Sequence, residues 1–305
     1  MKKIFLLPTE FDEIVKEPEK IPYGVKTIDA PQVWGETNGG AGNVVAVIDS
    51  GCQVDHPDLR GNIIGGYNFT NDDQGDTSNY YDYAGHGTHV AGTIGAIDNE
   101  TGVVGVAPNV NLLILKVVDK NGVGSYENLI NAIEYATNWR GPMGEKVSAM
   151  NISLGGPEDD PNLYSAILKA LRKGIITVAA AGNYGDNRAT TDEILYPAAY
   201  KEVIQVGAVD PNLAIGPFSN SNIEVDFVAP GSNILSTFPI STYARLTGTS
   251  MAAPHVTGAV ALLYNAFNAC DQSKIPGKVF DYLSRHARPL GFRSTLEGNG
   301  LVQLS

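Results

Sequence analysis

The sequence predicts an α/β fold of three layers, in which a mainly parallel, buried sheet is flanked by helices. Short unbroken apolar runs recur along the chain and end near Gly, Asn, Asp or Pro, which is typical of strands buried on both faces. Helical patterns lie between these runs, and such alternation implies a parallel sheet covered by helices. Functional groups should then gather at the carboxyl ends of the strands.

The predicted elements follow a leader of different composition. Residues 1–18 are charged, poor in Gly and end at Pro18, so we interpret them as an appendage to a domain over residues 19–305. The predicted strands are NVVAVIDSG, which starts at Asn43, and residues 112–118, 147–152, 175–181, 203–209 and 225–229. Apolar side chains recur at helical spacing in residues 127–139 and 161–174.

Composition and charge limit the possible partners and compartments. The chain has 305 residues, 43% of them apolar, and a formal net charge of -12 with no run of more than two Lys or Arg. Binding to nucleic acid or to an anionic membrane needs clustered positive charge, so we expect neither partner. Only four apolar residues separate Lys3 from Pro8, fewer than the roughly seven of a signal peptide. Cys52 and Cys270 do not make a disulfide framework, and we expect a soluble cytoplasmic protein.

Two candidate residues lie near the first strand. Asp49 ends that strand, where a carboxylate costs free energy unless it is paired, although a turn cap would also account for it. His86 and His89 flank Gly-Thr in AGHGTHVAG, and either imidazole alone can be structural. A zinc pair is conceivable, but zinc needs a third ligand, and no Glu lies between the two histidines.

Two further candidates lie nearer the C-terminus. Asn183 follows a buried strand in VAAAGNYG, either as a turn residue or as an amide donor that stabilises a negatively charged oxygen. Ser250 either begins a helix in GTSMAAPHV or serves as a nucleophile at its N-terminus. There, unpaired N–H groups and the helix dipole favour an oxyanion. We expect Pro254 in the first turn of that helix, where a missing N–H costs nothing.

The surroundings of these residues exclude two enzyme classes. An α/β-hydrolase has its serine in G-x-S-x-G, whereas Ser250 lies in Gly-Thr-Ser-Met-Ala. A dinucleotide-binding fingerprint follows its strand, whereas Gly40-Ala41-Gly42 precedes one. Neither class accounts for Asp49, His86 and Ser250 in this order along the chain.

Several blocks of the sequence resemble the subtilisin-like serine proteases, the subtilase family, whose catalytic residues follow the same order Asp, His, Ser along the chain. The blocks are VVAVIDSG, HPDL, GHGTHVAG, VGVAP, NISLGG, AAGN, YPA, VAPG and GTSMAAPHV, and they cover most of residues 21–265. With a short leader and no secretion signal, the chain resembles the intracellular type of Bacillus-like bacteria. The resemblance implies a serine endopeptidase of broad specificity, made as a zymogen.

The resemblance also implies a role for each candidate residue. Ser250 would attack the scissile carbonyl, His86 would take its proton, and Asp49 would orient the imidazole. Asn183 and the Ser250 backbone N–H would bind the oxyanion. An extended substrate would lie between two strand-like segments and fill the S1 and S4 pockets. The implied substrate-binding residues are Gly122, Gly124, Tyr126, Ser153, Leu154, Gly155, Ala180, Gly182 and Leu195.

Two calcium sites built from oxygen ligands are implied as well, as suits a hard cation. The stronger site would use the Asp58 carboxylate, the Asn99 side chain and the carbonyls of Ile97, Thr101 and Val103. The weaker site would use the carbonyls of Ala198, Tyr200 and Val203 together with Asp226.

The leader matches an inhibitory segment in length and place. In intracellular subtilisins a short extension crosses the active site and often carries Leu-Ile-Pro-Tyr, and this chain has Leu6-Leu7-Pro8-Thr9. Pro8 fixes φ and lacks an N–H, so it would bind the cleft while spoiling alignment for cleavage. The expected partners are protein substrates, the chain's own leader as inhibitor and a second copy in a homodimer. The alternative is a non-catalytic, peptide-binding relative. All four catalytic positions carry the residues that catalysis needs, which argues against this alternative.

Overall fold

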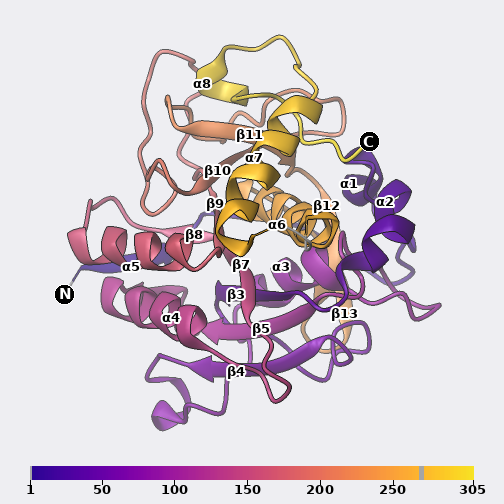
Figure 1. The fold of residues 1–305 in the computed structure, drawn as a ribbon, viewed down its shortest axis with the longest axis vertical. Helices are drawn as coiled ribbons and strands as arrows, with labels where there is room; N and C mark the ends of the chain where they lie inside the picture. The colour runs from indigo at the N-terminus through magenta and orange to yellow at the C-terminus, as the bar shows by residue number, and fades with distance from the viewer. Residues whose placement is uncertain (1, 268–270) are drawn as a thin grey trace.

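The computed structural model describes residues 2–267 and 271–305, and its centre is a sheet of seven parallel strands. They lie in the order β11, β10, β9, β7, β3, β5 and β4 (Figure 1). Their bounds are Val44–Asp49 (β3), Ile63–Asn68 (β4), Asn111–Lys116 (β5), Val147–Ile152 (β7), Ile176–Ala180 (β9), Ile204–Val209 (β10) and Val225–Pro230 (β11). All six predicted strands are present, and the sheet confirms the predicted fold class.

Helices cover both faces of this sheet. The two predicted helices, α4 (Tyr126–Asn138) and α5 (Pro161–Arg172), lie on one face, and α3 (His86–Gly95) and α6 (Thr249–Ala266) lie on the other (Figure 1). The further helices are α1 (Tyr23–Thr27), α2 (Ala30–Thr37), α7 (Ile275–His286) and α8 (Ser294–Glu297), with 3-10 turns at Asn38–Gly40, Asp72–Gly75 and Gln272–Lys274.

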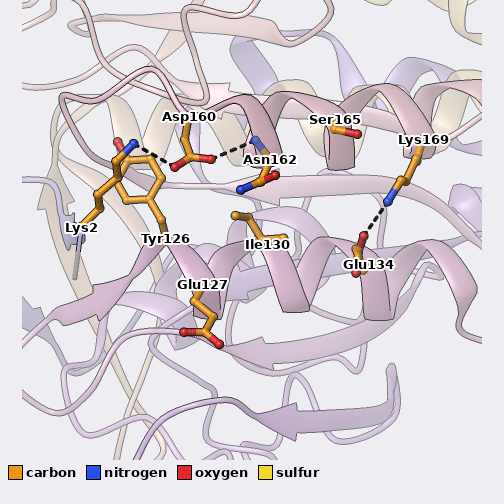
Figure 2. A pocket seen from close by; sticks show the side chains of 9 residues that line it. All are labelled: Lys2, Tyr126, Glu127, Ile130, Glu134, Asp160, Asn162, Ser165 and Lys169. Atoms are coloured by element: carbon orange, nitrogen blue, oxygen red, sulfur yellow. Dashed lines mark hydrogen bonds and ion pairs between the residues drawn. The ribbon is translucent and has the colours of Figure 1, made fainter.

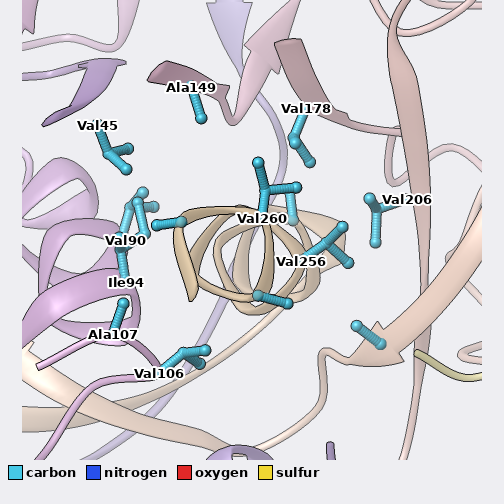
Figure 3. Packing of buried hydrophobic residues seen from close by; sticks show 14 of the residues in the cluster. Val45, Val90, Ile94, Val106, Ala107, Ala149, Val178, Val206, Val256 and Val260 are labelled. Carbon is cyan, nitrogen blue, oxygen red and sulfur yellow. The ribbon is translucent and has the colours of Figure 1, made fainter. Parts of the chain in front are cut away.

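The helix α6 runs through the core beside the sheet. All its residues from Thr249 to Leu263 are buried. Figure 3 shows Val256 and Val260 of α6 surrounded by apolar side chains of the sheet and of α3. Each buried valine contributes about 1.5–3 kcal/mol, so the packing holds the whole helix, and with it the N-terminal turn, in a fixed place.

The leader residues form two strands that add to two small sheets. β1 (Lys3–Leu6) lies between β6 (Val123–Ser125) and β8 (Leu154–Gly155). β2 (Glu10–Val15) pairs with β13 (Thr242–Thr247), whose other neighbour is β12 (Ile234–Phe238). The boundary between leader and domain at residue 18 stays a prediction.

The cysteines and the helices add two observations. Cys52 is buried with a free thiol, and burial raises the pKa of that thiol. Cys270 lies outside the described residues. Within the described part of the chain, none of the helices has the length and apolar character needed to cross a membrane.

Candidate active site

Asp49 and His86 form a buried hydrogen-bonded pair at the carboxyl edge of the sheet. Asp49 ends β3 and His86 begins α3, and the His86 Nδ1 lies 2.7 Å from the Asp49 Oδ1. Burial opposes a charge on His86, but the Asp49 charge and the hydrogen bond to it outweigh burial and raise the pKa of His86. The His86 Nε2 has no hydrogen-bond partner among the described residues, so this nitrogen is the one left to exchange a proton.

Ser250 lies in the first turn of α6, as the sequence predicts. Its side chain is buried, and its Oγ donates to the Ser153 carbonyl at 3.1 Å. The hydroxyl is therefore turned to the chain that follows β7 instead of to the imidazole.

Pro254 lies in the second turn of α6, not in the first turn as expected, because the helix already begins at Thr249. Since proline has no N–H, the Ser250 carbonyl four residues earlier loses its helical partner. Ser153 supplies the missing donor, with its Oγ 3.1 Å from the Ser250 carbonyl oxygen. Asn151 donates in turn to the Ser153 Oγ at 2.9 Å. The two serines are thus joined in both directions, which fixes the start of the helix.

The Asn183 amide has an orientation that its neighbours dictate. Its Oδ1 accepts from the Thr249 N–H at 2.8 Å and from the Thr249 hydroxyl at 2.7 Å. Because a backbone N–H can only donate, the amide oxygen faces Thr249 and Nδ2 is left for another acceptor. That acceptor is the Pro8 carbonyl of the leader, at 2.8 Å. Gly248 leaves room for the amide, since a Cβ there would lie 2.8 Å from Nδ2.

A second buried carboxylate, that of Asp82, lies close to His86 and was not predicted from the sequence. Asp82 accepts five hydrogen bonds of 2.7–3.0 Å. The donors are the hydroxyls of Ser50 and Thr88 and the N–H groups of Ala84, Gly85 and Thr88. Three of these donor residues, Ala84, Gly85 and Thr88, flank His86 in the chain, so Asp82 orders the loop that carries the imidazole, and its charge also favours the raised pKa of His86. The only signal in the sequence is Asp-x-x-Gly directly before the histidine, which reads as a turn cap.

His89 is a structural histidine. Its buried Nε2 lies 2.8 Å from the Ile234 carbonyl oxygen and 3.2 Å from that of Ala244. Burial lowers the pKa of His89 to about 3, so the ring is neutral. Over residues 2–267 and 271–305, no three His, Cys, Asp or Glu side chains gather as a zinc site would require, so the zinc alternative has no support.

The two predicted substrate-binding segments flank a cleft that the leader fills. β6 and β8 both pair antiparallel with β1, with Ile4 opposite Gly124 and Leu6 opposite Leu154. The Leu6 N–H also donates to the Gly122 carbonyl at 2.9 Å. Both segments therefore present main-chain groups to an extended peptide.

The predicted pocket residues lie around the same cleft. Tyr126 begins α4, and its hydroxyl bonds both the carbonyl and the N–H of Glu158, at 2.8 and 2.9 Å. Leu195 is buried against Gly155, on which a Cβ would lie 2.8 Å from the Leu195 Cδ2. The remaining pocket residues, Ala180 and Gly182, are buried at the end of β9.

The leader brings its own peptide bonds to the catalytic residues. Leu7 is 3% exposed, and its carbonyl accepts from the Thr9 hydroxyl at 3.0 Å. The Pro8 carbonyl, one residue later, is the one that the Asn183 amide holds. The Leu7 carbonyl is therefore hydrogen-bonded within the leader, and the Pro8 carbonyl instead accepts from the predicted oxyanion donor, Asn183.

Four of the residues predicted for a stronger calcium site, Asp58, Ile97, Asn99 and Val103, lie close together. Asp58 is fully buried; its Oδ2 accepts from the Val103 N–H and its Oδ1 from the Asn99 Nδ2, each at 3.0 Å. The Ile97 N–H donates to the Asp58 carbonyl at 2.9 Å, which draws the start of the loop to the same place. Asp58 forms no ion pair with a described side chain. A buried carboxylate without a cationic partner among the described side chains offers the kind of oxygen ligand that a hard cation prefers.

Asp226 of the weaker site has similar surroundings. Its Oδ2 accepts from the Gln205 N–H at 2.8 Å, two residues after Val203. Burial raises the pKa of Asp226 to about 7, which shows how poorly its charge is compensated. The Tyr200 carbonyl accepts from the Val203 N–H at 2.8 Å, in the turn that follows Ala198. A second calcium site at these residues stays a prediction.

Comparisons with known proteins agree with this geometry. Residues 40–295 match the model of the subtilase family. The chain is 48% identical over 305 residues to an intracellular serine protease of Paenibacillus polymyxa, an alignment that covers 100% of this chain and 91% of the relative. It is 48% identical to the major intracellular serine protease of Bacillus subtilis strain 168, with 99% and 94% covered. Subtilisin E of the same strain is 40% identical, with 97% of this chain and 73% of the relative covered.

Proposed function

Because the chain belongs to the subtilase family and is a serine endopeptidase, we propose that it cleaves peptide bonds through Asp49, His86 and Ser250. One observation carries this proposal. The His86 ring is held through Nδ1 by a buried carboxylate, and its Nε2 is left without a partner among the described residues. The start of α6 and the Asn183 amide lie at the same edge of the sheet.

Each group has a defined step in the proposed reaction. The Ser250 Oγ attacks the scissile carbonyl carbon, and its proton passes to the His86 Nε2. The Asp49 carboxylate stabilises the imidazolium that forms and keeps the ring in place. The Asn183 Nδ2 and the Ser250 backbone N–H stabilise the oxyanion. His86 then protonates the leaving amine, and water releases the acyl group by the same steps in the second half-reaction.

The Ser250 hydroxyl must first turn from the Ser153 carbonyl to the imidazole. A rotation about χ1 moves Oγ between staggered positions without movement of the helix. The bond that is given up joins two neutral groups, and such a bond contributes only about 1 kcal/mol. This rearrangement therefore adds little to the barrier.

We also propose that residues 1–18 act as an inhibitory leader of the zymogen. β1 lies between β6 and β8, where a substrate strand would add, and Leu7 is buried directly before Pro8, whose carbonyl accepts from Asn183. The Pro8 carbonyl occupies the Asn183 amide, while the Leu7 carbonyl is bound to Thr9. This offset supports a segment that binds as a substrate would but is not aligned for cleavage.

The cleft also supports a broad specificity, since strand addition contacts the main chain and tolerates many sequences. The compartment is proposed to be the cytoplasm, because two of the relatives are named intracellular proteases. The homodimer that the resemblance implies stays a prediction, which sedimentation of the purified protein would test.

Calcium is the proposed cofactor, with a structural role. Asp58, Asn99 and nearby carbonyls would hold one ion, and Asp226 with the carbonyls of Ala198, Tyr200 and Val203 would hold another. A bound calcium ion supplies positive charge that compensates buried carboxylates and ties loops together.

A covalent label tests the catalytic assignment. The protein without residues 1–18 is treated with a serine-directed phosphonate, and the adduct is located by mass spectrometry. We expect one adduct, on Ser250, which is absent in Ser250→Ala and retained in the surface control Ser165→Ala. An adduct on any other residue, or full peptide hydrolysis by Ser250→Ala, would contradict the assignment.

A further inference from the structure

The leader carries a lysine into an acidic recess at the far end of the cleft. The Lys2 Nζ lies 2.9 Å from the Asp160 Oδ2 and 3.4 Å from the Glu158 Oε2. Figure 2 shows Lys2 beside Tyr126, with its ammonium directed at Asp160. The recess lies between α4 and α5 and has a volume of about 460 Å³.

The position of Lys2 relative to the catalytic residues follows from the leader strand. Ile4 and Leu7 are 0% and 3% exposed, whereas Phe5 between them is 39% exposed. We assign these two buried side chains to the first and fourth places before the scissile bond of a substrate, P1 and P4, and in that register Lys2 stands at P6. The Lys2 carbonyl accepts from the Tyr126 N–H at 3.2 Å, so main-chain bonding to the cleft extends as far as this residue.

The Asp160 carboxylate and the backbone of Glu158 are held by bonds that do not involve the lysine. The Asp160 Oδ1 caps α5 by accepting from the N–H groups of Asn162 and Leu163, which leaves Oδ2 for a cation. The backbone of Glu158 is bonded on both sides by the Tyr126 hydroxyl. This geometry therefore does not depend on the leader.

The nearest cation on the domain is already engaged elsewhere. Lys169 of α5 also lines the recess, but its Nζ pairs with Glu134 at 2.8 Å (Figure 2). Removal of the leader would thus leave Glu158 and Asp160 without the ammonium that both of them contact here.

We propose that Glu158 and Asp160 form an S6 subsite that selects Lys or Arg at P6 of protein substrates. The inference rests on the proposed function, because it takes the leader as a guide to the path of a substrate strand. A substrate that adds to β6 and β8 in the same register carries its sixth residue to the place of Lys2. The two carboxylates then attract a basic side chain and repel an acidic one.

Peptides that differ only at P6 test this subsite. The protein without residues 1–18 is given fluorogenic peptides with Lys, Ala or Glu at P6 and the same residues from P5 onward. We expect kcat/KM to be about fivefold higher for Lys than for Ala at low salt, the size of an exposed ion pair, and lowest for Glu. Salt should reduce the preference. Lysine moved to P5 or P7 should give a smaller gain.

Two variant proteins, compared with the wild type, separate the subsite from general charge effects. Asp160→Asn keeps an N-cap residue on α5 but loses the charge, and with Glu158→Gln it should abolish the preference for Lys. Glu127→Gln removes a carboxylate that lines the same recess without contacting Lys2, and it should preserve the preference. A peptide that ends at P4 should be cleaved equally by all three proteins.

The outcomes distinguish this inference from the proposed function. An equal ratio of Lys to Ala cleavage in the wild type and in the Glu158→Gln, Asp160→Asn protein would overturn the subsite, while cleavage of the short peptide would still support the protease. Failure of every protein to cleave the short peptide would overturn both.

Discussion

The buried leucine of the leader offers a quantitative test of autoinhibition. Leu7, which directly follows β1, is 3% exposed, whereas Phe5 within that strand is 39% exposed. The initial rate of the uncleaved protein on a short peptide reports the fraction of molecules in which the leader has left the cleft. Leu7→Ala weakens the closed state, in which the leader occupies the cleft, and should therefore raise that initial rate.

The size of the effect follows from the burial. Leu7→Ala removes most of an apolar side chain from a buried place, which costs the closed state about 2 kcal/mol. That free energy corresponds to about a thirtyfold rise in the open fraction and in the initial rate. Phe5→Ala keeps the main-chain bonds of β1 and removes a side chain that is partly in water, so we expect a rise of less than about fivefold.

The assay compares initial rates of wild type, Leu7→Ala and Phe5→Ala on one fluorogenic peptide. Mass spectrometry at the same time point confirms that the leader is intact, and the protein without residues 1–18 gives the maximal rate. Thermal unfolding verifies that each variant is folded. Equal rates in Leu7→Ala and Phe5→Ala, or no gain on deletion of the leader, would refute the reasoning.

Three further predictions concern the site and its supports. His86 must be neutral to act as the base, so kcat/KM should fall as pH drops through the raised pKa of His86. Asp82→Asn removes a negative charge that favours the imidazolium, so it should move this acidic limb of the pH profile to lower pH. Gly248→Ala places a Cβ 2.8 Å from the oxyanion amide and should lower kcat by about tenfold or more with little change in KM, whereas Gly277→Ala, with open space around its Cβ, should keep full activity. Asp226 has a pKa of about 7 when folded, against an ordinary value of 3.8, so in a chelator the stability of the wild type should fall as pH rises from about 4 to 7. Asp226→Asn should remove both that fall and part of the gain in Tm on addition of calcium, as measured by calorimetry.

Much of the sheet can be predicted because strands buried on both faces leave a continuous apolar pattern. In β3 every side chain from Val44 to Asp49 is buried. The strand β4 left no such pattern, because it lies at the edge of the sheet and five of its six residues are only partly buried. Its Gly66 reads as a turn residue in the sequence, yet a Cβ there would lie 2.7 Å from the Ile114 carbonyl oxygen, so the close strand contact itself requires glycine.

The buried side chains that hold the candidate site in place were harder to predict than the candidate residues themselves. Lys116 interrupts the apolar run of residues 112–118, and it is fully buried. Its Nζ donates to the Ser50 carbonyl at 2.8 Å and pairs with Asp72 at 3.2 Å. These partners come from distant parts of the chain, and no local spacing relates them to one another. A motif reports residues that chemistry requires close together in sequence, whereas a buried ion pair reflects the packing of the whole domain.

The two leader strands contribute unequally to the closed state, and this bears on how activation becomes permanent. Phe11 and Ile14 of β2 are 53% and 46% exposed, so β2 is held by main-chain bonds to β13 and by surface pairs such as Glu13 with Arg245, at 3.3 Å. An exposed pair of this kind contributes about 0–1 kcal/mol, so most of the affinity resides in the half of the leader that fills the cleft. While the chain is intact, the covalent link keeps that half near the cleft at an effective concentration of about a millimolar. A cut near residue 18 removes this advantage, and dilution then favours release of the leader over rebinding.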